Sequence, residues 1–128
     1  MSAIALADQI VTAVVAHAEM CSPAECCGLL AIDDSGRVRF AYPLTNVEDS
    51  PMGFTVAPAE AHGAFLHAER MGWNIAGTFH SHPAGPDRLS GRDIDEAPGA
   101  DWLHLLITPT GLRAYRVENR IPMEMDLV

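Results

Sequence analysis

Two histidines, His80 and His82, stand two residues apart at the end of an apolar segment, in Gly77-Thr78-Phe79-His80-Ser81-His82-Pro83. If this segment is a β-strand, both side chains point to the same face of it. Two imidazoles on one rigid element are an arrangement suited to binding a metal ion. A strand with two exposed or hydrogen-bonded histidines explains the same pattern equally well.

Ser90 and Asp93 follow after a loop that is rich in proline and glycine. A serine followed three residues later by an acid is the pattern of a helix N-terminal capping box. The same helix start can also bring Asp93 close to the histidines, so that one carboxylate caps the helix and completes a site. Two histidines and a carboxylate leave a coordination position open for water, as in catalytic zinc sites. This ligand set also suits non-haem Fe(II) oxygenases.

Glu25 is the candidate proton shuttle for such a site, and it lies just before the apolar run Cys26 to Ile32. A metal-assisted hydrolysis needs a group that accepts a proton from water and passes it on. Spacing alone favours the simpler interpretation, that Glu25 is an ordinary acid in a loop between a helix and a strand. Cys26 and Cys27 have no separate His/Asn constellation that would make a thiol nucleophile. We expect them to be small buried residues beside Glu25.

These segments together resemble a known family. Glu25, then His80-Ser81-His82-Pro83, seven residues from Pro83 to Leu89, and Ser90-x-x-Asp93 resemble the complete signature of the JAMM (MPN+) zinc metallopeptidases. The flanking segments Glu-Cys-Cys-Gly-Leu-Leu and Ile-Ala-Gly-Thr-Phe-His-Ser-His-Pro are also similar to the family. The resemblance extends over roughly residues 5 to 118, which is nearly the whole chain.

The resemblance implies a role for each residue of the signature. It makes His80, His82 and Asp93 the zinc ligands. It makes Glu25 the general acid/base, and it makes Ser90 the hydrogen-bond donor that stabilises the tetrahedral intermediate. These roles agree with zinc-assisted amide hydrolysis, in which a carboxylate moves the proton and a hydroxyl meets the developing oxyanion.

The resemblance also implies a substrate. Family members cleave amide or isopeptide bonds after the C-terminal glycine of ubiquitin-like proteins, whose extended tail is the part that binds. Only eight residues separate Asp93 from Trp102, which leaves little room for the insertion that deubiquitinating members carry. The chain is more similar to compact bacterial members that release cysteine from ubiquitin-like sulfur-carrier proteins in cysteine biosynthesis. A non-catalytic MPN-type interaction module and a deubiquitinase-like isopeptidase with a different substrate are the alternatives.

Composition limits the other classes of function. The chain has 128 residues, enough for one domain over residues 1–128, and its net charge is −9 with eight arginines and no lysine. An acidic chain without a basic run is a poor partner for nucleic acid or an anionic membrane. Three cysteines without a Cys-x-x-Cys pair indicate a reducing cytoplasm. Met1 to Ala7 has no positive charge before its apolar residues, so we expect no secretory signal.

The order of predicted elements indicates a single-domain α/β (α+β) fold with a mixed sheet flanked by helices. We expect helices over residues 4–20, 58–71 and 91–97, and strands over residues 26–32, 37–42, 54–56, 73–80, 102–108 and 112–118. On the second helix we expect Ala61, Phe65, Ala68 and Met71 to share the buried side. The alternating segment from Ile121 to Val128 either completes the sheet or pairs with a second subunit in a homodimer.

Overall fold

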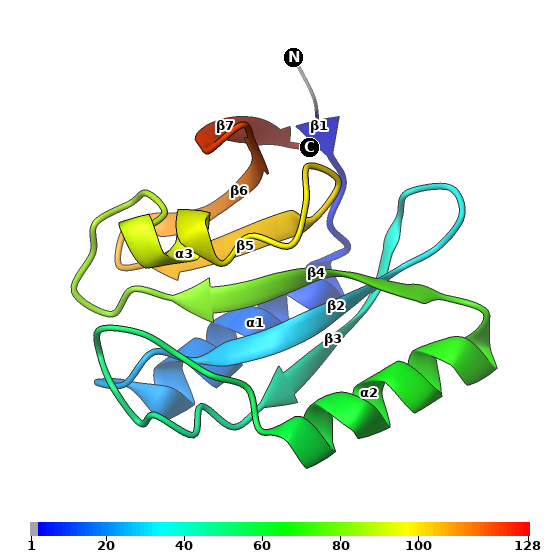
Figure 1. The fold of residues 1–128 in the computed structure, drawn as a ribbon, viewed down its shortest axis with the longest axis horizontal. Coiled ribbons are helices and arrows are strands. Elements are labelled where there is room, and N and C mark those ends of the chain that lie inside the picture. Colours follow the sequence, from blue (N-terminus) through cyan, green and yellow to red (C-terminus); the bar gives the residue numbers. More distant parts are fainter. Residues whose placement is uncertain (1–2) are drawn as a thin grey trace.

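The protein is built on one mixed sheet of seven strands with helices on both faces, as the computed structural model of residues 3–128 shows (Figure 1). The elements are β1 (Ala3–Ile4), α1 (Asp8–Cys21), β2 (Cys27–Ile32), β3 (Val38–Leu44), α2 (Pro58–Met71), β4 (Asn74–Ser81), α3 (Gly91–Asp95), β5 (Leu103–Thr108), β6 (Gly111–Glu118) and β7 (Ile121–Leu127). The strand order is β1-β7-β6-β5-β4-β2-β3, with parallel pairing only of β4 with β5 and of β1 with β7 in this part of the chain. The predicted mixed sheet flanked by helices is confirmed. Met1 and Ser2, which begin the segment considered for a secretory signal, lie outside the described residues.

Helix α1 covers one face of the sheet. Its buried residues Ile10 and Val14 belong to a core cluster with Leu30 of β2, Phe79 of β4 and Leu105 of β5. The spacing of the apolar residues in this part of the chain predicts a helix over residues 4–20. The helix begins at Asp8 rather than at residue 4, because Ala3–Ile4 instead pairs with β7 and buries Ile4.

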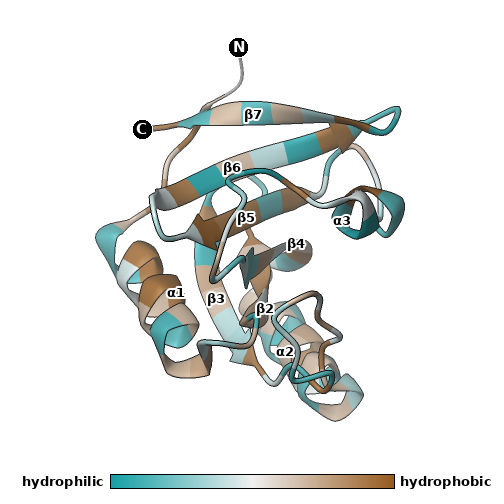
Figure 2. Ribbon diagram, turned by 90° about the vertical axis from the view of Figure 1, so that its left-hand side faces the viewer, coloured by the Kyte–Doolittle hydropathy of each residue, from teal (hydrophilic) through white to brown (hydrophobic). Residues whose placement is uncertain are grey.

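Helix α2 covers the opposite face, and Figure 2 shows the two helices on either side of β2 and β3. Its bounds are the predicted ones: Pro58 stands in the first turn, and Gly72 ends the helix in the left-handed conformation with φ 79°. The predicted buried side is wrong in part, since Phe65 and Met71 are 49% and 50% exposed. Ala64 and Ala68 face the sheet instead, because small side chains let the helix approach the bulky residues of β2 and β3 closely.

Two further expectations have clear outcomes. Residues 54–56 form no separate strand, and this stretch makes only the single bridge Asn46↔Val56. The C-terminal segment completes the sheet, because β7 lies between β6 and β1. Within residues 3–128, every helix is too short or too polar to cross a membrane.

Candidate metal centre

The pairing of β2 with β4 brings Glu25 to the histidines. The two strands are antiparallel with Cys27 opposite His80, and the Cys26 amide donates to Ser81 Oγ at 2.8 Å. Because side chains alternate along a strand, Glu25 and His80 are on the same side of the sheet. Glu25, His80 and His82 are all buried, and one potential ligand atom from each lies within 4.8 Å of the other two. Three predicted site residues therefore meet at one point, although Glu25 lies 55 and 57 positions before the two histidines.

Asp93 reaches the same point from α3. Its Oδ2 atom lies 3.1 Å from His80 Nε2 and 3.3 Å from His82 Nε2. The predicted capping box is also present: the Asp93 amide donates to Ser90 Oγ at 3.1 Å, and the Ser90 amide donates to Asp93 Oδ2 at 2.8 Å. One carboxylate thus caps the helix and contacts both histidines, as the sequence predicted.

The arrangement fits a tetrahedral metal ion. Zinc bonds of 2.0–2.1 Å at tetrahedral angles separate neighbouring ligand atoms by roughly 3.3 Å, close to the separations between Asp93 Oδ2 and the two Nε2 atoms. His82 Nδ1 lies 3.0 Å from the carbonyl oxygen of Pro86, to which it can donate. That hydrogen bond leaves the lone pair on His82 Nε2 free, as metal ligation requires. These three side chains could therefore hold a metal ion.

Burial and charge set the protonation of the site. Burial raises the pKa of Glu25 from 4.5 to about 7, against the opposing effect of His82. Burial also acts to raise the pKa of Asp93, but hydrogen bonds with His80 and His82 hold it well below its ordinary value. Glu25 Oε1 is buried without a hydrogen-bond partner in the described chain. Glu25 is therefore the carboxyl group of the site that can change its protonation near neutral pH.

The two cysteines beside Glu25 are unreactive at neutral pH. Cys26 and Cys27 are fully buried, and burial raises the pKa of both thiols to about 12. A thiol with so high a pKa is neither a nucleophile nor a ready metal ligand at neutral pH. The expectation that they are small buried residues is confirmed.

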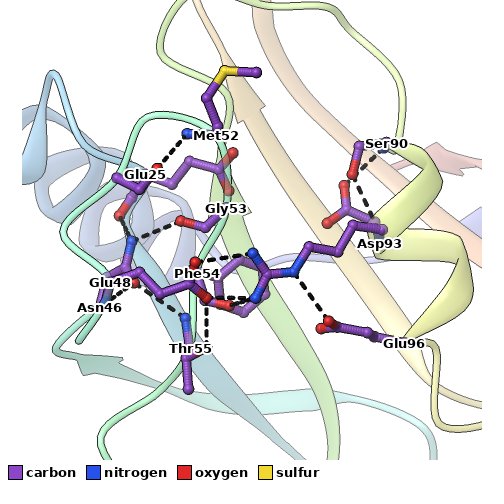
Figure 3. A network of polar contacts seen from close by, with 12 residues as sticks. Glu25, Asn46, Glu48, Met52, Gly53, Phe54, Thr55, Ser90, Asp93 and Glu96 are labelled. Atoms are coloured by element: carbon purple, nitrogen blue, oxygen red, sulfur yellow. Dashed lines mark hydrogen bonds and ion pairs between the residues drawn. The ribbon is translucent and has the colours of Figure 1, made fainter.

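The loop 45–57 forms one wall of the site, and Asn46 shapes it. The Asn46 side chain donates to the backbone oxygens of Glu25 and Gly53, at 3.1 and 3.0 Å. Its Oδ1 accepts from the amides of Glu48 and Thr55. Figure 3 shows these groups gathered around the Asn46 amide. Asn46 thus joins the backbone of Glu25 to the loop that faces α3.

Arg92 links this loop to α3. Its guanidinium donates to both carboxylate oxygens of Glu48, at 2.9 Å for one of them, to the Phe54 carbonyl at 3.2 Å, and from Nε to Glu96 at 3.0 Å. In Figure 3, Glu48 and Phe54 of the loop lie on one side of this network and Glu96, at the end of α3, lies on the other. The Phe54 ring in turn stacks on His80, with centroids 4.9 Å apart. The sequence prediction missed Asn46 and Arg92. The one signal was that Asn46 is a polar residue in a loop, and that Arg92 lies within the segment Ser90-x-x-Asp93.

Comparison with known proteins agrees with this geometry. Residues 7–119 match the family model described as prokaryotic homologs of the JAB domain. A desampylase of Haloferax volcanii is 33% identical over 91 residues, which is 70% of this chain and 66% of that protein, slightly under two thirds. A probable TtuB-protein conjugate cleaving protease of Thermus thermophilus is 35% identical over 75% of this chain and 70% of its own length. A CysO-cysteine peptidase of Mycobacterium tuberculosis is 31% identical over 84% of this chain and 78% of its own length.

Solved structures show the same fold. A protein of Desulfitobacterium hafniense superposes with a TM-score of 0.84 and 31% identity, over 98% of this chain and 91% of that one. A JAB1/MPN domain protein of Archaeoglobus fulgidus superposes with a TM-score of 0.63 and 18% identity, over 100% and 99% of the two chains, and shows the fold alone. The family match covers far more than half of the residues. This chain therefore belongs to the prokaryotic homologues of the JAB domain.

Proposed function

We propose that this protein is a single-domain, zinc-dependent hydrolase that cleaves the amide or isopeptide bond after the C-terminal glycine of a ubiquitin-like protein. The observation that carries the proposal is the convergence of Glu25 with two histidines and Asp93, at separations that suit zinc. His80, His82 and Asp93 would hold the ion. When bound there, zinc would polarise the scissile carbonyl and lower the pKa of water.

Glu25 and Ser90 would supply the remaining chemistry. With a pKa raised to about 7, the Glu25 carboxylate can take the proton of the attacking water and return it to the leaving amine. Ser90 Oγ accepts from the Asp93 amide, so its own hydrogen is free to point toward the oxygen of the scissile carbonyl. A hydrogen bond to an oxyanion of this kind contributes ~3 kcal/mol to transition-state stabilisation.

Release of cysteine from a sulfur-carrier protein, as a step of cysteine biosynthesis in the cytoplasm, is the reaction we favour. The Mycobacterium relative is named a CysO-cysteine peptidase, and its match covers more of this chain than those of the Haloferax and Thermus relatives. Only the short stretch 96–102 connects α3 to β5, so this side of the site has no large insertion. Three free cysteines suit a reducing compartment. The name of the Thermus relative, a conjugate cleaving protease, supports the second candidate, an isopeptidase for lysine-linked conjugates.

Mass spectrometry of candidate ubiquitin-like carriers tests this proposal. One set of carriers has a C-terminal cysteine, and the other set has an isopeptide-linked lysine. We expect the enzyme to remove one of these two adducts specifically, and we expect a zinc chelator to block that removal. Glu25→Gln should abolish turnover while the fold and zinc binding remain; an active variant would contradict the role of Glu25. A protein that binds the carrier tightly, but holds no metal and cleaves neither adduct, would instead be an interaction module.

A further inference from the structure

We infer that His104 is a positioning residue that holds the ring of His80 through a water molecule in the cavity of the proposed site. The cavity has a volume of about 130 Å³ and is lined by both histidines, by Ser90 and Asp93 of the site, and by Thr78 and Trp102. The sequence marks His104 only as a lone histidine. The inference rests on the proposed zinc hydrolase function, because the ring it positions is that of a proposed zinc ligand.

Both histidines that line this cavity have a buried nitrogen without a hydrogen-bond partner in residues 3–128. His80 is 1% exposed and His104 is 4% exposed. Within the described residues, His80 Nδ1 and His104 Nε2 are both buried and make no hydrogen bond to protein atoms. A buried polar group left without a hydrogen bond is destabilising, so a shared partner for these two atoms is favoured.

The sheet register explains why the two rings approach each other. Strands β4 and β5 are parallel, with Thr78 directly beside His104. His80 is two residues further along β4, and its side chain is therefore on the same face as that of Thr78. His80 and His104 are thus diagonal neighbours on one face of the sheet.

The cavity suits water. A single water needs about 10–15 Å³ of such space and typically makes about three hydrogen bonds. The two nitrogens supply two partners, and Thr78 Oγ1 on the cavity wall can supply the third while it accepts from Trp102 Nε1 at 3.1 Å. A cavity with three polar partners is therefore expected to be hydrated.

The hydrogen-bond directions are consistent with zinc binding at His80. A neutral imidazole has one donor and one acceptor nitrogen, so a ring that ligates through Nε2 carries its hydrogen on Nδ1. His80 Nδ1 would donate to the water, and the water would donate to His104 Nε2. His82 makes the corresponding hydrogen bond without a bridging water, because its Nδ1 atom lies 3.0 Å from the carbonyl oxygen of Pro86. The fold thus orients one ligand through the backbone and the other through His104.

The test compares His104→Leu, which removes the acceptor, with His104→Gln, whose amide can replace it. Thr108→Val, at the other end of β5, is a control for loss of a buried polar group from the same strand. Zinc affinity is measured by competition with a chromophoric chelator. In the zinc-loaded protein, ¹⁵N-imidazole NMR reports the hydrogen on His80 Nδ1, and thermal unfolding gives the stability of each metal-free variant.

We expect His104→Leu to lose 10- to 100-fold in zinc affinity, the usual effect of removing such an orienting partner. His104→Gln should recover most of that loss, and Thr108→Val should bind zinc like the wild type. Metal-free His104→Leu should lose no more stability than metal-free Thr108→Val, which removes another buried polar group from the same strand. A larger loss of stability that accompanies the loss of affinity would mark His104 as a purely structural residue and overturn the inference. Wild-type zinc affinity and an unchanged His80 Nδ1 signal in His104→Leu would overturn the inference and leave the proposed function intact. A wild-type protein that fails to bind zinc would overturn both.

Discussion

Replacing Glu25 by glutamine should stabilise the metal-free protein at neutral and alkaline pH. Burial raises the pKa of this carboxyl from 4.5 to about 7 in the folded state. A raised folded-state pKa means that the native protein holds this proton more tightly than the unfolded chain does. The stabilising effect is therefore complete below pH 4.5 and is lost as the pH rises through 7. Glutamine stays neutral throughout, so Glu25→Gln escapes this loss.

The difference between the two pKa values sets the magnitude. The shift from 4.5 to about 7 corresponds to on the order of 3 kcal/mol, at 1.36 kcal/mol for each pKa unit. Glu25 is 5% exposed, so solvent screens this effect little. For a domain of 128 residues, 3 kcal/mol moves the unfolding temperature by roughly 10 °C. Burying the glutamine amide changes the free energy of unfolding by the same amount at every pH. The prediction therefore concerns how the difference in unfolding free energy between Glu25→Gln and wild type changes with pH, and not the size of that difference at one pH.

The assay is chemical unfolding of both proteins in chelator, from pH 4.5 to pH 8. The free-energy difference between Glu25→Gln and wild type should grow by about 3 kcal/mol across this range, while Glu69→Gln, an exposed control on α2, should give a flat difference. With zinc bound the growth should shrink, because a nearby cation favours the ionised carboxylate. A flat difference for Glu25→Gln in chelator would refute the reasoning, since it would mean that Glu25 is solvated.

Further predictions concern the metal, the loop and the sheet. Saturating zinc at 100 times its dissociation constant should stabilise the wild type by about 2.7 kcal/mol, whereas Asp93→Asn should show little stabilisation in the same thermal melt. Arg92→Ala, which frees the loop from α3, should lower kcat/KM. It should change the free energy of unfolding by less than about 1 kcal/mol, because the ion pair of Arg92 with Glu48 is exposed. A much larger loss of stability would contradict a role confined to the loop. Gly28→Ala should unfold the protein or cost several kcal/mol, because its Cβ would lie 2.1 Å from the Phe79 ring and 2.3 Å from the Tyr42 carbonyl. Gly63→Ala on α2, with nothing within 4 Å, should instead gain about 1 kcal/mol in denaturant titrations.

Local patterns in the sequence predicted most of the elements. The helix predicted over residues 58–71 matches the bounds of α2 without error. The capping pattern at Ser90 and Asp93 gave the start of α3. Patterns of this kind depend on neighbours within one or two turns, so the sequence contains them directly. The buried side of α2 was predicted wrongly in part, because Phe65 is apolar enough for the core and only the shape of the sheet excludes it.

The sequence by itself determined which residue types are available for chemistry and that His80 and His82 share a face, since strand geometry fixes their relation. Only the tertiary structure decided that Glu25 lies beside them, because it is the antiparallel pairing of β2 with β4 that brings Glu25 close to a histidine 55 positions further along the chain. It also decided that Asn46 and Arg92 fix the loop over the site, and that His104 shares a cavity with His80. Such contacts depend on how distant strands pair and where loops close, and the local sequence around each residue contains no record of its distant partner.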